Sequence, residues 1–156
     1  MNTTKERVTE QLDDPVAQEL LRSNLTAQLA YTALDGTPRV VPIWFEWRGD
    51  ELVFASPHGA PKIEALKKHP QVAVSIDTDV FPYKVLQIRG EARVEELDDV
   101  PSEYAAAAGR YFGPVQGPGW IEQLHKMNKQ AMARISVRPQ SVVILDFVKR
   151  FPKALT

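Results

Sequence analysis

The chain of 156 residues contains no cysteine. Its absence excludes disulfide bonds, thiol catalysis, iron–sulfur clusters and cysteine-type zinc sites, because each of these requires that side chain. The chain has only three histidines, and His58, His69 and His125 are too scattered along the sequence to indicate a metal centre. No acidic or basic residue stands out as a general acid or base. We therefore predict no metal site and no catalytic side chain.

An excess of charge of either sign is also missing. The 19 basic and 20 acidic side chains give a formal net charge of -1, so the surface offers no electrostatic reason to expect a nucleic-acid partner. No apolar run approaches the roughly 20 residues that span a bilayer. The first ten residues are polar and lack the apolar core of a signal peptide. We expect neither a nucleic-acid nor a membrane partner, and a cytoplasmic location.

The composition is that of an ordinary globular protein, with 44% apolar and 25% charged residues. Its length is close to that of one domain, so we predict a single domain over residues 1–156. Asp14-Pro15 is typical of a helix start, and Val16, Leu20 and Leu21 follow it at helical spacing. Residues 1–24 are therefore predicted to form an N-terminal helical segment.

Strand patterns dominate the rest of the chain. Residues 26–34 alternate apolar and polar side chains, and Asp35-Gly36 then predicts a tight hairpin turn, because glycine readily adopts the positive φ such turns need. Arg48-Gly49-Asp50 is interpreted as a second hairpin turn. The predicted strands are residues 26–34, 39–47, 51–56, 71–77, 83–95, 133–137 and 141–147. The last two flank a predicted turn at 138–140.

Helices are predicted at three further places. Residues 61–68 form a short helix in which Glu64 can pair with Lys68 four positions later. Residues 98–112 form another, ended by Gly113-Pro114, and residues 120–132 follow a loop at Gly117-Pro118-Gly119. Seven short strands with helices inserted late in the sequence predict a small β-barrel with peripheral helices.

Three blocks carry a resemblance to a known family. They are D-G-T-P-R-V-V-P-I-W-F at 35–45, the strand, loop, helix and H-P-Q-V turn of 52–72, and the G-E-A strand of 85–94. In this order and spacing the chain resembles the FMN-binding split-barrel superfamily, which contains pyridoxamine 5'-phosphate oxidase and the flavin- and deazaflavin (F420)-dependent oxidoreductases. The resemblance implies a mainly β fold with α elements, a split β-barrel of six to seven antiparallel strands with peripheral helices.

The start of the predicted helix at Pro61 suggests an anion site on physical grounds. Ala60 stands at the N-cap and has no side chain able to cap, so the amides of Lys62, Ile63 and Glu64 need another acceptor. A phosphate would satisfy them, and the Lys62 ammonium would add a full charge at the positive end of the helix dipole. Water is the alternative acceptor, with Lys62 an ordinary solvated lysine.

The resemblance carries over only part of the oxidase's FMN site. The positions of its strand arginine, its strand hydroxyl and its loop lysine are occupied by Arg39, Ser56 and Lys62. Three further polar contacts are missing, because they fall on Pro61, on Trp44 and near Val85, and the C-terminal substrate motif with arginine and histidine is absent as well. The chain is therefore not expected to be a true pyridoxamine 5'-phosphate oxidase.

The remaining pattern is similar to the deazaflavin branch, with Arg134 as a further anion contact. This implies an oxidoreductase that uses F420 or FMN to transfer hydride to a small unsaturated or aromatic substrate. The alternative is a non-catalytic protein of the same fold that binds or stores F420, FMN or haem. The predicted cofactor-binding residues are Arg39, Val41, Pro42, Ile43, Trp44, Ser56, Pro57, His58, Lys62 and Arg134.

Aromatic residues enter two further predictions. Family members close the cofactor groove with a second subunit, so the resemblance implies a homodimer, with Trp44, Phe45 and Trp47 near its interface. For Trp44 and Trp47, packing beside the cofactor ring and packing in the core are the alternatives. The aromatic residues of the late helices are predicted either to pack on the barrel or to form a wall over the cofactor ring, and they are Tyr104, Tyr111, Phe112 and Trp120.

Overall fold

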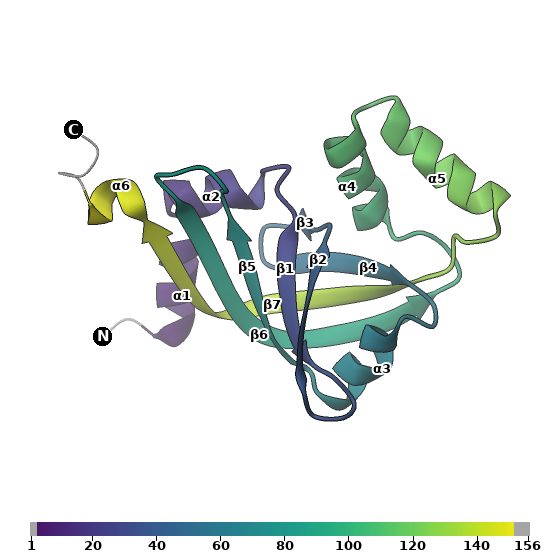
Figure 1. Ribbon diagram of the computed structural model, residues 1–156, viewed down its shortest axis with the longest axis horizontal. Helices are drawn as coiled ribbons and strands as arrows, with labels where there is room; N and C mark the ends of the chain where they lie inside the picture. The colour runs from purple at the N-terminus through teal and green to yellow at the C-terminus, as the bar shows by residue number, and fades with distance from the viewer. Residues whose placement is uncertain (1–2, 152–156) are drawn as a thin grey trace.

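The computed structural model describes residues 3–151 and consists of one curved sheet with helices at its ends (Figure 1). All strand pairs are antiparallel, in the order β2-β1-β5-β6-β7-β4-β3. The strands are β1 (Ala27–Thr32), β2 (Pro38–Ile43), β3 (Glu46–Trp47), β4 (Leu52–Pro57), β5 (Gln71–Asp77), β6 (Lys84–Leu97) and β7 (Met132–Asp146). The predicted mainly β fold with α elements is confirmed.

The two edge strands of this sheet are neighbours in the sequence. Only Trp44 and Phe45 separate β2, which pairs with β1, from β3, which pairs with β4. A connection of two residues spans only about 10 Å, so the sheet has to curl until its two edges approach each other. The hydrogen-bonded ladder does not close between them, which is consistent with a split barrel. We call Trp44 and Phe45 the barrel corner.

The longest strands run through the sheet as single elements, which corrects one prediction. Two strands around a turn at 138–140 were expected, but β7 continues through these residues. The register shifts between Arg89 and Gly90 on β6, so that Gly90 lies opposite Pro139. An irregularity of this kind accommodates a proline, which has no N–H to give to the ladder. The Pro139 signal therefore marks a bend in the strand rather than its end.

The N-terminal helices cover one end of the sheet (Figure 1). In α1 (Thr4–Leu12) the Thr3 side chain accepts from the Glu6 amide and the Glu6 carboxylate accepts from the Thr3 amide, which is a capping box. In α2 (Pro15–Leu21) the Asp14 side chain caps Val16, as the Asp-Pro pair predicts. Residues 1 and 2 of the predicted helical segment lie outside the described residues.

The helices α4 (Ser102–Phe112) and α5 (Gln116–Lys126) form a hairpin at the opposite end (Figure 1). The loop predicted at 117–119 is wrong, because these residues form the first turn of α5. Pro118 is tolerated there, since the first turn has no use for its missing N–H. A Cβ on Gly117 would lie 2.6 Å from the Gly109 Cα, so glycine allows the two helices to approach closely.

Two element boundaries also differ from the predictions. The helix expected over 120–132 ends at Lys126, because Met132 already belongs to β7. The strand expected to reach residue 147 stops at Asp146, whose side chain caps the short helix α6 (Phe147–Arg150). The helix α3 (Pro61–Lys68) has the predicted bounds. Among the described residues no helix is long and apolar enough to cross a bilayer.

The main core lies inside the curved sheet and under α1 and α2. A smaller buried cluster of Ala55, Leu124 and Met132 lies beneath the α4–α5 hairpin. The largest fully buried side chains are Phe45, Phe54, Leu20, Leu21, Leu29, Leu52, Ile63, Leu66, Ile76, Leu86, Ile88 and Met132. Phe45 and Leu52 bring the barrel corner and β4 into this core, so the segments that flank the candidate site are firmly packed.

Candidate functional site

Lys62 and Ser56 meet where β4 gives way to α3. The Lys62 Nζ donates to the Ser56 Oγ at 2.8 Å, and Ser56 is only 2% exposed. The loop between them turns at Gly59, whose φ of +82° favours glycine. The structure therefore brings together two of the residues that the resemblance assigns to a phosphate.

The Lys62 ammonium is partly withdrawn from water without receiving an opposite charge. Burial lowers the pKa of Lys62 below its ordinary value. Within residues 3–151 its polar partner is the neutral hydroxyl of Ser56, and no carboxylate forms an ion pair with it. A bound anion would restore the electrostatic stabilisation that this lysine has lost, so the position is favourable for a phosphate.

The N-terminus of α3 supports the same reading, with two corrections. Ala60 provides no side-chain cap, as expected. The Ile63 amide, however, donates to the Ala60 carbonyl at 3.0 Å and is not free. The carboxylate of Glu64 contacts Lys67 at 3.1 Å rather than Lys68. The anion site therefore depends on the Lys62 side chain and the helix dipole more than on three open amides.

Arg39 lies on β2, and its contacts belong to the neighbouring turn. Its guanidinium donates to the hydroxyl of Thr37 and contacts the Asp35 carboxylate at 3.3 Å. The side chain is 47% exposed. The hydrogen-bond and ion-pair partners of Arg39 within the described residues lie at 35–38, and its role at a cofactor stays a prediction.

Arg134 already has acidic partners. It lies opposite Ala55 in the β4–β7 pairing, next to Ser56, but its guanidinium forms ion pairs with Glu103, with Glu95 at 3.6 Å and with Glu51 at 4.0 Å. These carboxylates offset its charge and weaken its attraction for an additional anion. We therefore leave Arg134 out of the proposed phosphate site, and its role as an anion contact stays a prediction.

The segment Val41–Trp44 contains the last three residues of the edge strand β2 and the first residue of the barrel corner. Strand β2 pairs with β1 alone, so one side of its backbone is not used by the ladder. The hydrogen bond from the Ala33 amide to the Thr37 carbonyl sets the alternation of this ladder, so that Val41 and Ile43 face β1 while Pro42, which has no N–H, faces the open side. The amide of Trp44, beyond the end of β2, is therefore the possible donor to a ring edge in this segment. Pro57 and His58 lie exposed at the end of β4 and in the following loop.

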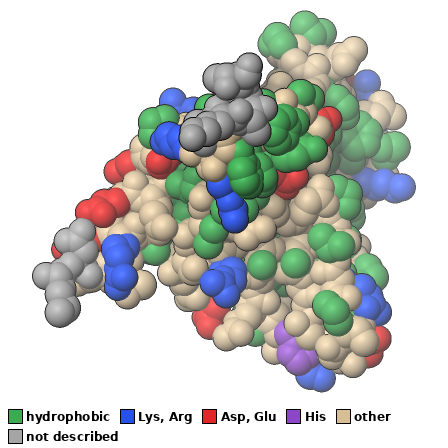
Figure 2. All heavy atoms as spheres, turned by 60° about the vertical axis from the view of Figure 1, so that its left-hand side comes forward, with side chains coloured by type: hydrophobic (Ala, Val, Ile, Leu, Met, Phe, Trp, Pro, Cys, Tyr) green, Lys and Arg blue, Asp and Glu red, His purple; other side chains and the backbone are tan. Residues whose placement is uncertain are grey.

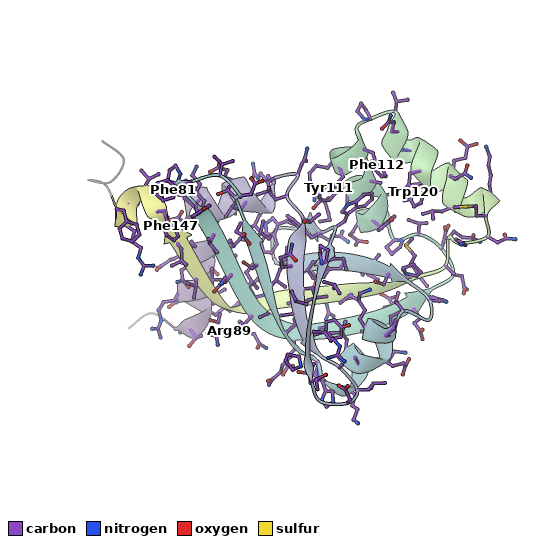
Figure 3. The ribbon with its side chains drawn as sticks, in the orientation of Figure 1. Phe81, Arg89, Tyr111, Phe112, Trp120 and Phe147 are labelled. Atoms are coloured by element: carbon purple, nitrogen blue, oxygen red, sulfur yellow. The ribbon has the colours of Figure 1, made fainter. Side chains whose placement is uncertain are left out.

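The Trp44 ring is enclosed by aromatic residues of α4. It stacks on Tyr111 at 5.0 Å between ring centroids and 11° between planes, and it meets Phe112 edge to face at 4.8 Å. Trp120 of α5 donates from its indole nitrogen to the Tyr104 hydroxyl at 3.1 Å. Figure 3 shows Tyr111, Phe112 and Trp120 gathered at the hairpin end of the molecule. These side chains form an aromatic wall beside the barrel corner.

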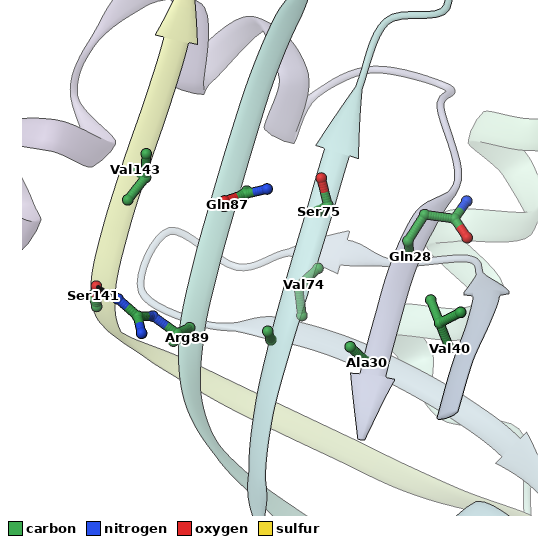
Figure 4. A pocket seen from close by; sticks show the side chains of 10 residues that line it. Gln28, Ala30, Val40, Val74, Ser75, Gln87, Arg89, Ser141 and Val143 are labelled. Atoms are coloured by element: carbon green, nitrogen blue, oxygen red, sulfur yellow. Dashed lines mark hydrogen bonds between the residues drawn. The ribbon is translucent and has the colours of Figure 1, made fainter. Parts of the chain in front are cut away.

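The outer face of the sheet carries a hollow that the sequence analysis missed. Its volume is about 360 Å³, and it lies across β1, β2, β5, β6 and β7 (Figure 4). The lining side chains are small, apolar or neutral, apart from Arg89; among them Val40 is 63% exposed and Val143 is 40% exposed. The sequence feature that indicates this hollow is the small number of charged side chains among the outward-facing residues of these strands.

The predicted interface residues are placed elsewhere. Phe45 is fully buried, Trp47 packs against the main core, and Trp44 is enclosed by α4. Phe45 thus packs in the core of the single chain, and a subunit interface near these strands stays a prediction. Exposed apolar side chains instead gather on the outer sheet face and at the α6 end of the molecule (Figure 2), where Phe81 and Tyr83 are 48% and 40% exposed.

The chain is similar in fold to several solved structures. An F420 reductase is 31% identical, with a TM-score of 0.65 over 80% of this chain and 93% of that chain. The conserved hypothetical protein Rv2991 from Mycobacterium tuberculosis is 20% identical, with a TM-score of 0.67 over 84% of this chain and 82% of its own. The haem storage protein HutZ from Vibrio cholerae is 19% identical, with a TM-score of 0.60 over 84% and 93%.

A search of curated proteins finds no match. The family model for pyridoxamine 5'-phosphate oxidase matches residues 14–143, which is most of the chain and includes every predicted cofactor-binding residue. This match and the split-barrel arrangement of the sheet confirm the resemblance read from the three sequence blocks. The chain belongs to the pyridoxamine 5'-phosphate oxidase family.

Proposed function

We propose that this protein is an oxidoreductase that binds F420 or, as the second choice, FMN, and transfers hydride to a small unsaturated or aromatic substrate. The observation that carries the proposal is the partly buried Lys62 ammonium, which has a hydroxyl partner and lies at a helix start without a side-chain cap. A cation in this position binds the phosphate group that both cofactors carry.

The residues of this chain have separate tasks in the proposal. Lys62 and Ser56 bind the phosphate, and the backbone amide of Trp44, at the end of the Val41–Trp44 edge, donates to the ring. The aromatic wall on α4 excludes water from one side and offers flat surfaces to a planar substrate. The cofactor, when bound, supplies the hydride chemistry, so the protein needs no acid or base of its own.

F420 is preferred to FMN for two reasons. Three polar FMN contacts of the oxidase, two basic residues and a glutamine, fall on or near Pro61, Trp44 and Val85, none of which has a basic or amide side chain. The F420 reductase is also the more similar in sequence of the structures compared above. FMN remains the alternative because the backbone amide of Trp44 would serve its ring edge equally well.

Two measurements test this function. Adding F420, FMN and haem separately to the purified protein, and following fluorescence or absorbance, identifies the cofactor; we expect F420 to bind most tightly. Oxidation of the reduced cofactor is then followed over a panel of enones and quinones. Turnover supports the oxidoreductase, tight binding without turnover on any acceptor indicates a storage protein, and preferential binding of haem would contradict the proposal.

We also propose that a second copy of the chain covers the outer sheet face. The face is poor in charge, as the centre of an interface is. Its charged side chains include Arg89 near one end and Asp77 at the other, both exposed, with the Ser75–Gln87 pair between them. A two-fold axis across the strands at that pair places Asp77 of one copy beside Arg89 of the other, so the face is complementary to itself.

Charge reversal tests this dimer. We expect the unmodified protein to be a dimer by light scattering, and Arg89→Asp or Asp77→Arg alone to weaken association about tenfold or more, because like charges then meet. The double variant restores the pair and should restore the dimer. A monomeric parent protein, or a double variant no better than the single ones, would rule out this interface.

A further inference from the structure

Arg110 connects α4 to the barrel corner more extensively than an ordinary ion pair. Its Nε donates to the Ser23 carbonyl at 3.1 Å, and its two terminal nitrogens donate to the Phe45 carbonyl and to the Glu46 carboxylate. The guanidinium also lies over the rings of Phe45 and Tyr111, at 5.2 and 5.0 Å from their centroids. With a side-chain exposure of 19%, it is largely withdrawn from water.

The corner needs such support because the sheet does not hold it. Trp44 and Phe45 lie between β2 and β3 and belong to neither strand, so no ladder orients their peptide groups. Consecutive residues of α4 take over this task. Arg110 binds the carbonyl of Phe45, and Tyr111 stacks on the ring of Trp44 while its hydroxyl donates to the Leu25 carbonyl at 2.8 Å.

We infer that Arg110 is a positioning residue that fixes the barrel corner, and with it the Val41–Trp44 backbone edge to which the proposed function assigns the cofactor ring. This inference rests on the proposed function and adds a residue to it. In this proposal Arg110 does not touch the cofactor ring. It acts through the Phe45 carbonyl, which is one residue from the end of that edge.

The fork of the guanidinium is essential to this role. Three groups in different directions accept from Arg110 at once, and a lysine ammonium on a flexible stem cannot reproduce that geometry. Glu46 forms an ion pair with the charge of Arg110. A lysine at this position would keep the ion pair but would no longer orient the barrel corner. Arg110→Lys therefore separates positioning from charge.

Arg48→Lys is the matched control. Arg48 also ties α4 to the barrel, through Glu103, but it lies in the β3–β4 turn and none of its interactions involves the corner. In the protein without cofactor, near-ultraviolet circular dichroism should report a changed Trp44–Tyr111 stack in Arg110→Lys and an unchanged one in Arg48→Lys. Both variants should retain the far-ultraviolet spectrum of the folded protein.

Binding provides the second readout. Arg110→Lys should weaken the binding of the cofactor and the binding of its tail-free ring analogue by the same factor, about tenfold. The reason is that the substitution disturbs the backbone that contacts the ring and leaves the phosphate site intact. Lys62→Glu should weaken only the form with the tail. Unchanged ring binding in Arg110→Lys, with the effect of Lys62→Glu intact, would overturn the inference alone. Unchanged binding in Lys62→Glu would instead overturn the proposed function.

Discussion

Lys62→Glu is expected to weaken cofactor binding at least about a hundredfold. The change removes a charge-assisted hydrogen bond and places a second negative charge beside the phosphate, effects that together are worth roughly 3 kcal/mol. The loss should be large because the Lys62 ammonium is partly buried, where water screens the repulsion less than at the surface. Fluorescence titration of the purified variant with F420 and with FMN measures it.

Lys68→Glu is the matched control for this charge reversal. Lys68 lies exposed in the last turn of the same helix, and its replacement by glutamate changes the net charge of the protein by the same amount as Lys62→Glu. Affinity should change less than about threefold, because an exposed charge a full helix away is screened. Equal losses in the two variants would indicate a general effect of protein charge, and an unchanged affinity in Lys62→Glu would remove the phosphate site.

Gly90→Ala is expected to destabilise the fold by about 3 kcal/mol, at the upper end of typical overpacking costs. A Cβ at Gly90 would lie 2.3 Å from the Arg138 carbonyl oxygen and 3.0 Å from a Val137 methyl. The oxygen belongs to the backbone of β7 in the middle of the longest strand pairing, so relief requires the strands to separate locally. Thermal unfolding should show a midpoint lower by about 10 °C.

Gly109→Ala provides the comparison. Gly109 lies in α4, and a Cβ there meets no atom within 4 Å. Alanine favours the helix over glycine by up to about 1 kcal/mol, so this variant should be as stable as the parent or slightly more stable. Equal stability of Gly90→Ala and the parent would show that β6 and β7 do not approach as closely as described.

Local signals in the sequence predicted much of the fold. Asp35-Gly36 fixed the β1–β2 hairpin, and Pro61 marked the start of α3, because turn geometry and helix starts depend on residues close in sequence. The pairing of Ser56 with Lys62 was accessible for the same reason, since only one loop separates them. Local chemistry was sufficient for these features.

Features that depend on contacts between segments far apart in the chain could not be predicted from local sequence. Pro139 is a turn signal that β7 overrides, because β6 pairs with this strand on both sides of it. Arg134 was predicted as an anion contact, and its ion pair with Glu103, 31 residues earlier, was not evident from the sequence. The burial of Phe45 in the core was not evident either, because an alternating pattern does not reveal that a two-residue corner turns this side chain inward.

The central claim is that Lys62 and the start of α3 bind the phosphate-bearing tail of a planar redox cofactor. The most direct test compares the affinity of the unmodified protein for the preferred cofactor with that for its tail-free form, riboflavin for FMN or the corresponding deazariboflavin for F420. The account predicts that the phosphate-bearing form binds about a hundredfold more tightly. Equal affinities would contradict it.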